Sequence, residues 1–438
     1  MNYRPSAPFA GCIVALLALG GAGVWAWHKV NSVPLALRAN LTFLEALKFK
    51  NTIDTDPPTP AQLAAVRNAA VALKEKLTAE FPALKVTPRP VADDENGFLL
   101  LCNLTNHKDP ATRHLPISDK FERILAEQSA AGEPKPWDPE AAEHCLAEHG
   151  ELVSRIEHIA ALTNRSSSNM SPEYSGIFNA RAGKTSCDIL LLKARLAAEA
   201  GDDTETLRLV AAAGNLGSHY HGVESPSLFS ETVVILIDLE IRRIAFKSLL
   251  HALGRNADLD RWKAVLGNRS CTPSDLAAVM RGEWDIDADF MTFPVLIAAA
   301  RSHQLQDPEA VARAYTSWIN TCVTRLSSVE LSDMATAISQ PAATSNLSKE
   351  GREVISSLAD GIAGWTKGYI RAAACLAQFR AGLDLLVLEK SGVTLADAGQ
   401  VTRDPVSGSA FLFDADKRTV AAPPGTAALN VEPLALPW

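Results

Sequence analysis

Aromatic residues and clustered basic residues are both scarce in this sequence. Aromatics make up 6% of the 438 residues, and the 42 lysine and arginine residues are dispersed along the chain. A nucleic-acid-binding surface needs clustered cationic side chains. Their dispersal, together with a net charge of −8, argues against nucleic acid as a partner.

The motif of a helical zinc protease is missing as well. That motif places two histidines four residues apart with a glutamate between them. His144 and Glu148 share a helical face, but His149 follows His144 by five residues and faces another side. His158 lies several turns further along the helix axis. We interpret these side chains as the exposed surface of an acidic helix.

Other partial motifs also fall short of a site. His219 and His221 alternate in a predicted loop, and a pair without a third ligand is a weak metal signal. The run Gly183-Lys-Thr-Ser is similar to part of a phosphate loop, but Phe178 stands where the first glycine belongs. We predict a helix N-terminus there. With no Gly-x-Ser-x-Gly elbow present, we predict no catalytic, cofactor-binding or metal-binding residue.

The cysteines contain no Cys-x-x-Cys pair, which argues against a zinc or thioredoxin-type motif. Cys322 and Cys375 lie among small helical residues and resemble buried core positions. We expect mostly free thiols, with at most one or two disulfides. The cysteines that follow the N-terminal segment are Cys102, Cys145, Cys187, Cys271, Cys322 and Cys375.

A helical pattern dominates what is present. Apolar residues make up 47% of the chain, and alanine and leucine favour helices. The central stretch from Ser186 to Leu253 predicts a helical hairpin with a third helix behind it. Gly201 can end the first helix, and Asp202 with Glu205 can cap the second. The hairpin resembles a tetratricopeptide unit, but one copy without a period does not predict a repeat array.

The N-terminal run from Phe9 to Trp27 carries no charge and is long enough to span a bilayer as a helix. Trp25 and Trp27 stand where interfacial aromatic residues occur. The alternative is a cleaved signal peptide with Val24 and Ala26 before the cleavage site. We favour the uncleaved transmembrane anchor.

The predicted fold class is mainly α, with an irregular multi-helix body, a small C-terminal β-hairpin and one N-terminal transmembrane helix. Helices are expected over 33–49, 60–81, 118–130, 139–162 and 350–390, and 423–438 is expected to be loose. In the hairpin, Ala410–Phe413 pairs with Arg418–Ala421, and Phe411 or Phe413 packs near Phe379. The predicted parts are 1–28 (anchor), 29–170 (N-terminal helices), 171–340 (central hairpin), 341–400 (long helix) and 401–438 (β element).

This arrangement resembles a group of single-span, membrane-anchored, mostly helical bacterial envelope proteins. The resemblance is carried by Leu191–Leu209 around Ala-Gly-Asp-Asp, by Phe379–Leu395, and by Asp404-Pro-Val-Ser-Gly-Ser-Ala-Phe-Leu-Phe. The last run is similar to an Asp-Pro-Phe-Ser-Gly-x-Pro-Phe-x-Tyr motif, and it also resembles the C-terminal segments of pseudopilins. It departs from that motif at Val406, Ala410 and Phe413.

The resemblance implies a protein of the bacterial inner membrane, with residues from Asn31 onward in the periplasm. We therefore expect a membrane-tethered scaffold or protein-binding module without catalysis. The membrane is contacted through residues 9–27, and the protein partner is unknown. The alternative is a metal-dependent or other hydrolase whose site is assembled from dispersed His, Asp and Glu residues.

Overall fold

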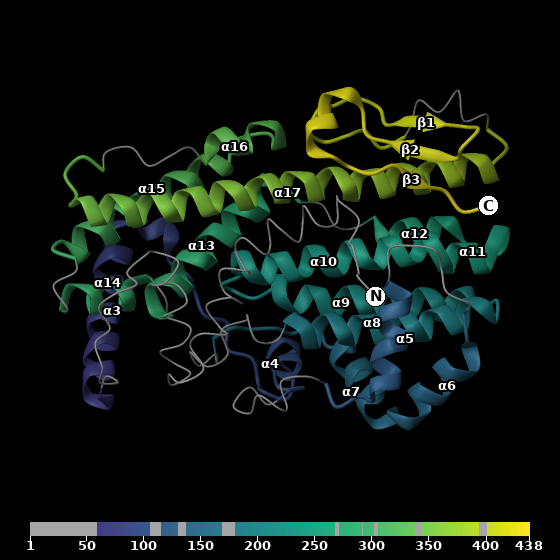
Figure 1. Cartoon of the computed structure of the whole chain (residues 1–438), viewed down its shortest axis with the longest axis horizontal. Helices are drawn as coiled ribbons and strands as arrows, with labels where there is room; N and C mark the ends of the chain where they lie inside the picture. The colour runs from purple at the N-terminus through teal and green to yellow at the C-terminus, as the bar shows by residue number, and fades with distance from the viewer. Residues whose placement is uncertain are drawn as a thin grey trace, which may run out of the picture. The chain divides into compact units, whose positions relative to one another are not determined.

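The computed structural model describes residues 59–105, 115–129, 137–168, 180–267, 271–290, 292–301, 305–338, 344–393 and 401–438. Over these residues the protein is mainly helical and ends in a small antiparallel sheet, as the sequence predicts (Figure 1). The predicted anchor, residues 9–27, and the predicted helix over 33–49 lie outside the described residues. Within them, no helix combines the length and apolar character that crossing a bilayer requires.

Helices form most of the described chain. They are α3 (Pro60–Glu80), α4 (Gly97–Cys102), α5 (Asp119–Ser129), α6 (Pro139–Glu148), α7 (Gly150–Ala161), α8 (Ala180–Glu199), α9 (Asp203–His221), α10 (Leu228–Ile244), a π-helical turn (Ala245–Leu249), α11 (Leu250–Leu253), α12 (Leu259–Leu266), α13 (Pro273–Phe290), α14 (Thr292–Arg301), α15 (Pro308–Leu326), α16 (Met334–Ala337) and α17 (Lys349–Lys390). The helix predicted over 139–162 is divided into α6 and α7 beside Gly150.

The chain folds into two compact units. Unit 1 is formed by residues up to Thr87, by Ser225–Leu228 and by Thr272–Ile370. Unit 2 is formed by Pro88–Glu224, Phe229–Cys271 and Arg371–Trp438. Each unit therefore combines segments that are distant in sequence, and the five-part division along the sequence stays a prediction.

Unit 1 is built around α13 and α15, which pack against each other and, with α14, against α3. The start of α3 follows its sequence signals, because Pro60 occupies the first turn and Thr59 forms a capping box with Gln62. Its core contains large aromatic side chains. The rings of Trp284 and Phe293 meet edge to face at 6.3 Å, and both are fully buried.

Unit 2 is organised around the hairpin of α8 and α9, the most extensively contacting pair of helices in the described chain. Gly201 has φ of 77°, and the Asp202 side chain accepts a hydrogen bond from the Glu205 N–H at 2.9 Å. The predicted glycine turn and the predicted Asp202 cap are thereby confirmed. The likeness of this hairpin to a tetratricopeptide unit stays a prediction.

One prediction for this region is wrong. His219 and His221 lie in the last turn of α9 and not in a loop. The helix continues because Tyr220 is fully buried and holds this turn against the core. The polar residues on either side of Tyr220 give no sign of this tertiary contact in the sequence.

A second prediction for the hairpin region is also wrong. The charges of Asp238 and Arg242, four residues apart, predict a solvent-exposed side of the third helix, but the two residues are only 8% and 3% exposed. Arg242 Nη1 lies 3.3 Å from Asp238 Oδ1, and Nη2 donates to the Leu266 carbonyl. Residues of α12 thus cover a face of α10 that the sequence pattern predicts to be exposed to solvent.

The C-terminal sheet lies along the end of α17 (Figure 1). Strands β1 (Leu412–Asp414), β2 (Thr419–Ala421) and β3 (Leu434–Ala435) pair in that order, all antiparallel. The predicted hairpin is confirmed, with Phe413 opposite Val420. Gln378 of α17 donates to the Val420 carbonyl at 2.7 Å, and Phe411 and Phe413 belong to the same core group as Phe379.

The prediction of a loose C-terminal tail is wrong. Residues 424–429 form a 3₁₀ helix, and β3 adds a third strand. Leu436 N–H donates to the Arg418 carbonyl at 2.9 Å. Leu434 and Leu436 also approach Gly382 of α17 closely enough that a Cβ there would meet them at 3.0 and 3.2 Å. Tertiary packing on α17 therefore orders a segment whose composition is typical of loops.

Candidate functional site

The histidines of α6 and α7 lie in different surroundings and do not form one site. His149 lies between the two helices, where its Nδ1 donates to the Cys145 carbonyl at 2.9 Å and its Nε2 accepts the Ser118 N–H at 3.2 Å. These bonds assign the neutral tautomer and occupy both ring nitrogens. The remaining candidates are exposed on the helices: His144, Glu148 and His158.

The pair on α9 is divided between the core and the surface. His219 is fully buried, and its Nε2 donates to the Ile159 carbonyl at 2.9 Å. Burial lowers the pKa of His219 to about 4, so its ring is neutral. The ring fills the space above Gly97, where a Cβ would lie 2.6 Å from Nδ1. His221 instead pairs with the buried Glu231 at 2.7 Å.

The run Gly183-Lys-Thr-Ser lies inside α8, so its backbone N–H groups belong to a helix and not to a phosphate loop. The glycine is needed for packing, because a Cβ at Gly183 would lie 2.8 Å from Cε2 of Tyr220. Lys184 binds Asp188 one turn later at 2.7 Å. Gly183 therefore allows the close contact between α8 and α9.

The cysteines of the described residues are free thiols, and all but Cys375 are buried. Burial raises the pKa of Cys187 well above its ordinary value and that of Cys322 to about 12. A reactive cysteine needs a thiolate and access to solvent. The free cysteines are Cys102, Cys145, Cys187, Cys271, Cys322 and Cys375.

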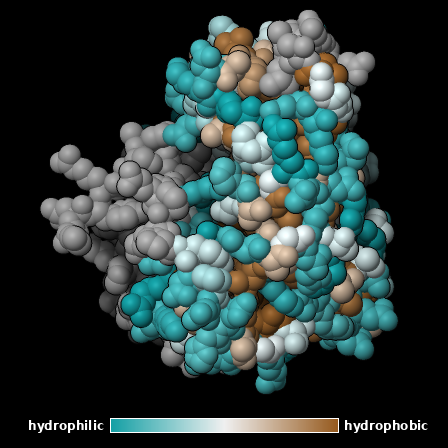
Figure 2. Space-filling view, turned by 90° about the vertical axis from the view of Figure 1, so that its right-hand side faces the viewer, coloured by the Kyte–Doolittle hydropathy of each residue, from teal (hydrophilic) through white to brown (hydrophobic). Residues whose placement is uncertain are grey.

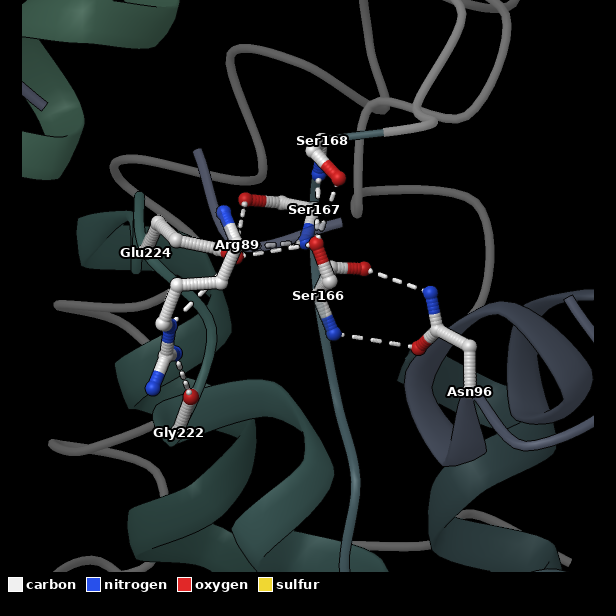
Figure 3. A network of polar contacts seen from close by, with 7 residues as sticks. All are labelled: Arg89, Asn96, Ser166, Ser167, Ser168, Gly222 and Glu224. Carbon is white, nitrogen blue, oxygen red and sulfur yellow. Dashed lines mark hydrogen bonds and ion pairs between the residues drawn. The ribbon is translucent and has the colours of Figure 1, made fainter. Parts of the chain in front are cut away.

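A polar network in unit 2 converges on the carboxylate of Glu224 (Figure 3). Its Oε1 accepts the Arg89 N–H at 2.8 Å and the Ser166 hydroxyl at 2.9 Å. Its Oε2 accepts the N–H and the hydroxyl of Ser167 at 2.8 and 3.1 Å. On the opposite side of the serine run, Asn96 exchanges hydrogen bonds with the Ser166 backbone, Nδ2 to O at 3.0 Å and N to Oδ1 at 3.1 Å.

The chemistry of this network is structural. The Glu224 side chain is 4% exposed. Burial raises its pKa, but hydrogen bonds from Ser167, Ser166 and Arg89 outweigh that effect and lower the pKa overall. A carboxylate with a lowered pKa is a poor general base at neutral pH. The network therefore joins three distant segments of unit 2 and does not activate a serine.

A buried carboxyl pair in unit 1 is the strongest acid–base feature of the described residues. Glu283 and Asp287 lie one turn apart on α13, and Asp287 is 4% exposed. Glu283 accepts the Leu228 N–H at 2.8 Å, and the Tyr315 hydroxyl donates to Asp287. Burial, and for Glu283 also the neighbouring Asp287, raises the pKa of Glu283 to about 8 and that of Asp287 to about 6. The two values belong to the pair as a unit.

A hollow of about 800 Å³ runs beside α15 in unit 1. Small side chains at helical spacing create it: Ala310, Ala314, Ser317 and Thr321 all line it. Leu347, from the segment before α17, also borders the hollow. Arg313 lines the hollow and pairs with Glu80 and Glu309. The lining is thus mixed, with a floor of small residues and charged groups along it.

Figure 2 shows one face, on which apolar side chains form a narrow, broken band between hydrophilic ones. Single exposed apolar residues are normal on a soluble surface. The large apolar side chains exposed among the described residues are far apart in sequence: Val71, Leu236, Val393 and Leu412.

Comparison of the chain with protein-family models, with curated proteins and with solved structures found no match.

Sequence reasoning missed both features of unit 1. The carboxyl pair has a readable signal, since Glu283, Asp285, Asp287 and Asp289 alternate on one helix. That alternation by itself suggests an exposed acidic helix. Only the structure shows that one side of this helix is buried. The hollow has a weaker signal, because small residues at helical spacing are as common in packed interfaces as in open grooves.

Proposed function

We propose that this protein works by binding a helical segment of a partner protein in the hollow beside α15. The observation that carries the proposal is the line of small residues at positions 310, 314, 317 and 321, which recur at the spacing of one helical face. A helix that presents small side chains allows a second helix to approach closely.

The size and lining of the hollow support this assignment. Its volume is about 800 Å³, and its lining extends along α15 from Pro308 to Arg325. Trp318 and Leu347 also line the hollow and add apolar surface, and both are buried. Arg313 and Glu309 lie where they can orient a polar partner side chain. Helix-in-groove recognition uses this combination of an apolar floor and a polar rim.

A photo-crosslinking amino acid at Ser317 tests the proposal. We expect it to give a covalent adduct with one partner protein in cells, because Ser317 is exposed and lines the hollow. Mass spectrometry of the adduct would identify the partner and the attached segment. The matched control is the same crosslinker at Thr324, which is exposed on the same helix but does not line the hollow.

Filling the hollow supplies a second measurement. Ala314→Trp should reduce the yield of the Ser317 adduct by about tenfold or more, since a loss of ~1.4 kcal/mol of binding energy corresponds to a factor of ten. Circular dichroism verifies that the variant is folded. Equal adducts from Ser317 and Thr324, or an adduct that survives Ala314→Trp, would contradict the proposal.

We further propose that residues 9–27 tether the protein to a bacterial inner membrane, with the folded units on the periplasmic side. The support is the uncharged apolar run and the two tryptophans at its end. A reporter fused after Trp438 that is active only in the cytoplasm should be silent, whereas a reporter that requires export should be active. Activity of the cytoplasmic reporter would refute this orientation.

A second candidate function is hydrolysis with acid–base groups from dispersed residues. The specific observation in its favour is the carboxyl pair Glu283 and Asp287, because pKa values pushed apart within one pair are a feature of acid–base sites. Asp287→Asn should then abolish a hydrolytic activity of the purified protein. Binding without any such activity favours the first proposal.

A further inference from the structure

Four carboxylates of α13 lie on two faces of the helix, and the two faces differ in the groups that bind them. Asp285 and Asp289 share one face, where Lys74 of α3 binds Asp285 Oδ1 at 2.7 Å and Asp289 Oδ2 at 2.6 Å. Glu283 and Asp287 also share a face, about half a turn around the helix from the first pair. The hydrogen-bond donors to this pair include the Leu228 N–H and the Tyr315 hydroxyl, which carry no charge. One pair is thus neutralised by a cation, while the other is held by neutral donors.

The short segment Ser225–Leu228 is attached to the same helix. Leu228 N–H donates to Glu283 Oε2 at 2.8 Å, and the Ser225 hydroxyl donates to Asp285 Oδ2 at 2.7 Å. The backbone of Pro226 lies so close to Gly282 that a Cβ there would be 2.6 Å from the proline nitrogen. Leu228 is also the first residue of α10. Glu283 therefore accepts one of the N–H groups that a helix start leaves without a partner.

We propose that Glu283 and Asp287 form a one-proton carboxyl pair that controls the attachment of Ser225–Leu228 to α13. When the pair holds a proton, only one negative charge occupies the site, and Glu283 keeps the Leu228 N–H. When both groups are ionised, two negative charges one turn apart repel each other in a poorly solvated place. Glu283 is the less buried partner, so its side chain turns to solvent and releases the segment.

The neighbouring titratable groups leave this mechanism intact. The titratable groups that interact with the pair or lie beside it on α13 are Tyr315 and Cys322 of α15, and Asp285 and Asp289 of α13 with Lys74 of α3. Lys74 is engaged by the opposite face of α13. Burial and the nearby carboxylates hold the pKa of Tyr315 well above its ordinary value, and burial raises that of Cys322 to about 12. Both therefore stay neutral while the pair titrates.

The sign of the pH dependence follows from burial. Because the pKa values of the pair are raised in the folded state, the folded protein retains protons that the unfolded chain has lost. The attachment is therefore strongest on the acid side. It weakens as the pH rises through the folded values of about 6 and about 8.

Hydrogen–deuterium exchange of the full chain tests the mechanism. After correction for the intrinsic pH dependence of exchange, we expect amide protection of a peptide covering 225–229 to fall about tenfold or more between roughly pH 6 and 9, since one pKa unit corresponds to a factor of ten. Glu283→Gln keeps an acceptor for the Leu228 N–H and removes the charge. Its protection should be high and independent of pH.

Two further variants keep the test decisive. Asp287→Asn also removes the second charge and should flatten the profile, which covers the case in which Glu283→Gln does not fold. Asp289→Asn changes a carboxyl of the same helix that Lys74 already compensates, so it should keep the wild-type profile. A flat wild-type profile, an unchanged profile in both Glu283→Gln and Asp287→Asn, or a flat profile in Asp289→Asn would overturn the proposal.

Discussion

The substitution Gly282→Ala should lower the free energy of unfolding of unit 1 by about 3 kcal/mol, the upper end for overpacked sites. Gly282 is buried in α13, and an added Cβ would lie 2.6 Å from the Pro226 nitrogen and 2.7 Å from the Ser225 carbonyl carbon. Both neighbours are backbone atoms, which cannot turn aside as a flexible side chain would. Chemical denaturation monitored by tryptophan fluorescence measures the loss.

The same substitution elsewhere in unit 1 should have the opposite sign. Gly364 lies exposed in α17, and no atom would approach an added Cβ within 4 Å. Alanine is preferred over glycine in a helix interior, so Gly364→Ala should stabilise the protein by about 0.5–1 kcal/mol. If both variants shift stability in the same direction, the close contact of Gly282 with the Ser225–Pro226 backbone is refuted.

Glu224→Ala should destabilise unit 2 by about 3 kcal/mol. The change removes the acceptor of the Arg89 and Ser167 N–H groups and of the Ser166 and Ser167 hydroxyls. Buried donors left without an acceptor cost about 1–3 kcal/mol each, and relaxation of the loop recovers part of that sum. The control is Glu95→Ala, because Glu95 is exposed and surface changes usually stay within about 0.5 kcal/mol.

The contribution of Glu224 should also depend on pH. Its folded pKa is lower than the ordinary value of 4.5, so the stabilisation is present above that value and is lost as the pH falls through the folded pKa. The difference in stability between the wild type and Glu224→Gln, which cannot be ionised, should therefore shrink on acidification below about pH 4.5. A difference that stays constant down to pH 3 would show that the hydrogen bonds do not favour the charged form.

Several features of this protein follow from local sequence signals. The start of α3 at Pro60, the turn at Gly201 and Asp202, and the hairpin of β1 and β2 were all predictable. Each depends on groups within a few residues of one another: a side chain that caps its own helix, a glycine with positive φ, or two short strands joined by a tight turn. Such interactions form in the same way whatever packs around them.

Other features depended on segments that are far apart in sequence. The burial of Asp238 and Arg242 comes from α12, and β3 is ordered by its contact with β2 and α17. Periodicity shows which face of a helix is apolar, but it does not show how many neighbours cover the polar face. Composition likewise cannot show that a proline-rich tail meets a strand edge.

The candidate sites divide in the same way. From the sequence alone, the wrong spacing of His144 and His149 and the missing first glycine before Gly183 already argued against the familiar motifs. Only the tertiary structure decided that Glu283 and Asp287 lie in a poorly solvated place beside Leu228, and that small residues of α15 border an open hollow. The reason is physical: the pKa of a carboxyl group and the openness of a groove are set by the atoms that surround them in space, and in this chain those atoms come from segments tens of residues away.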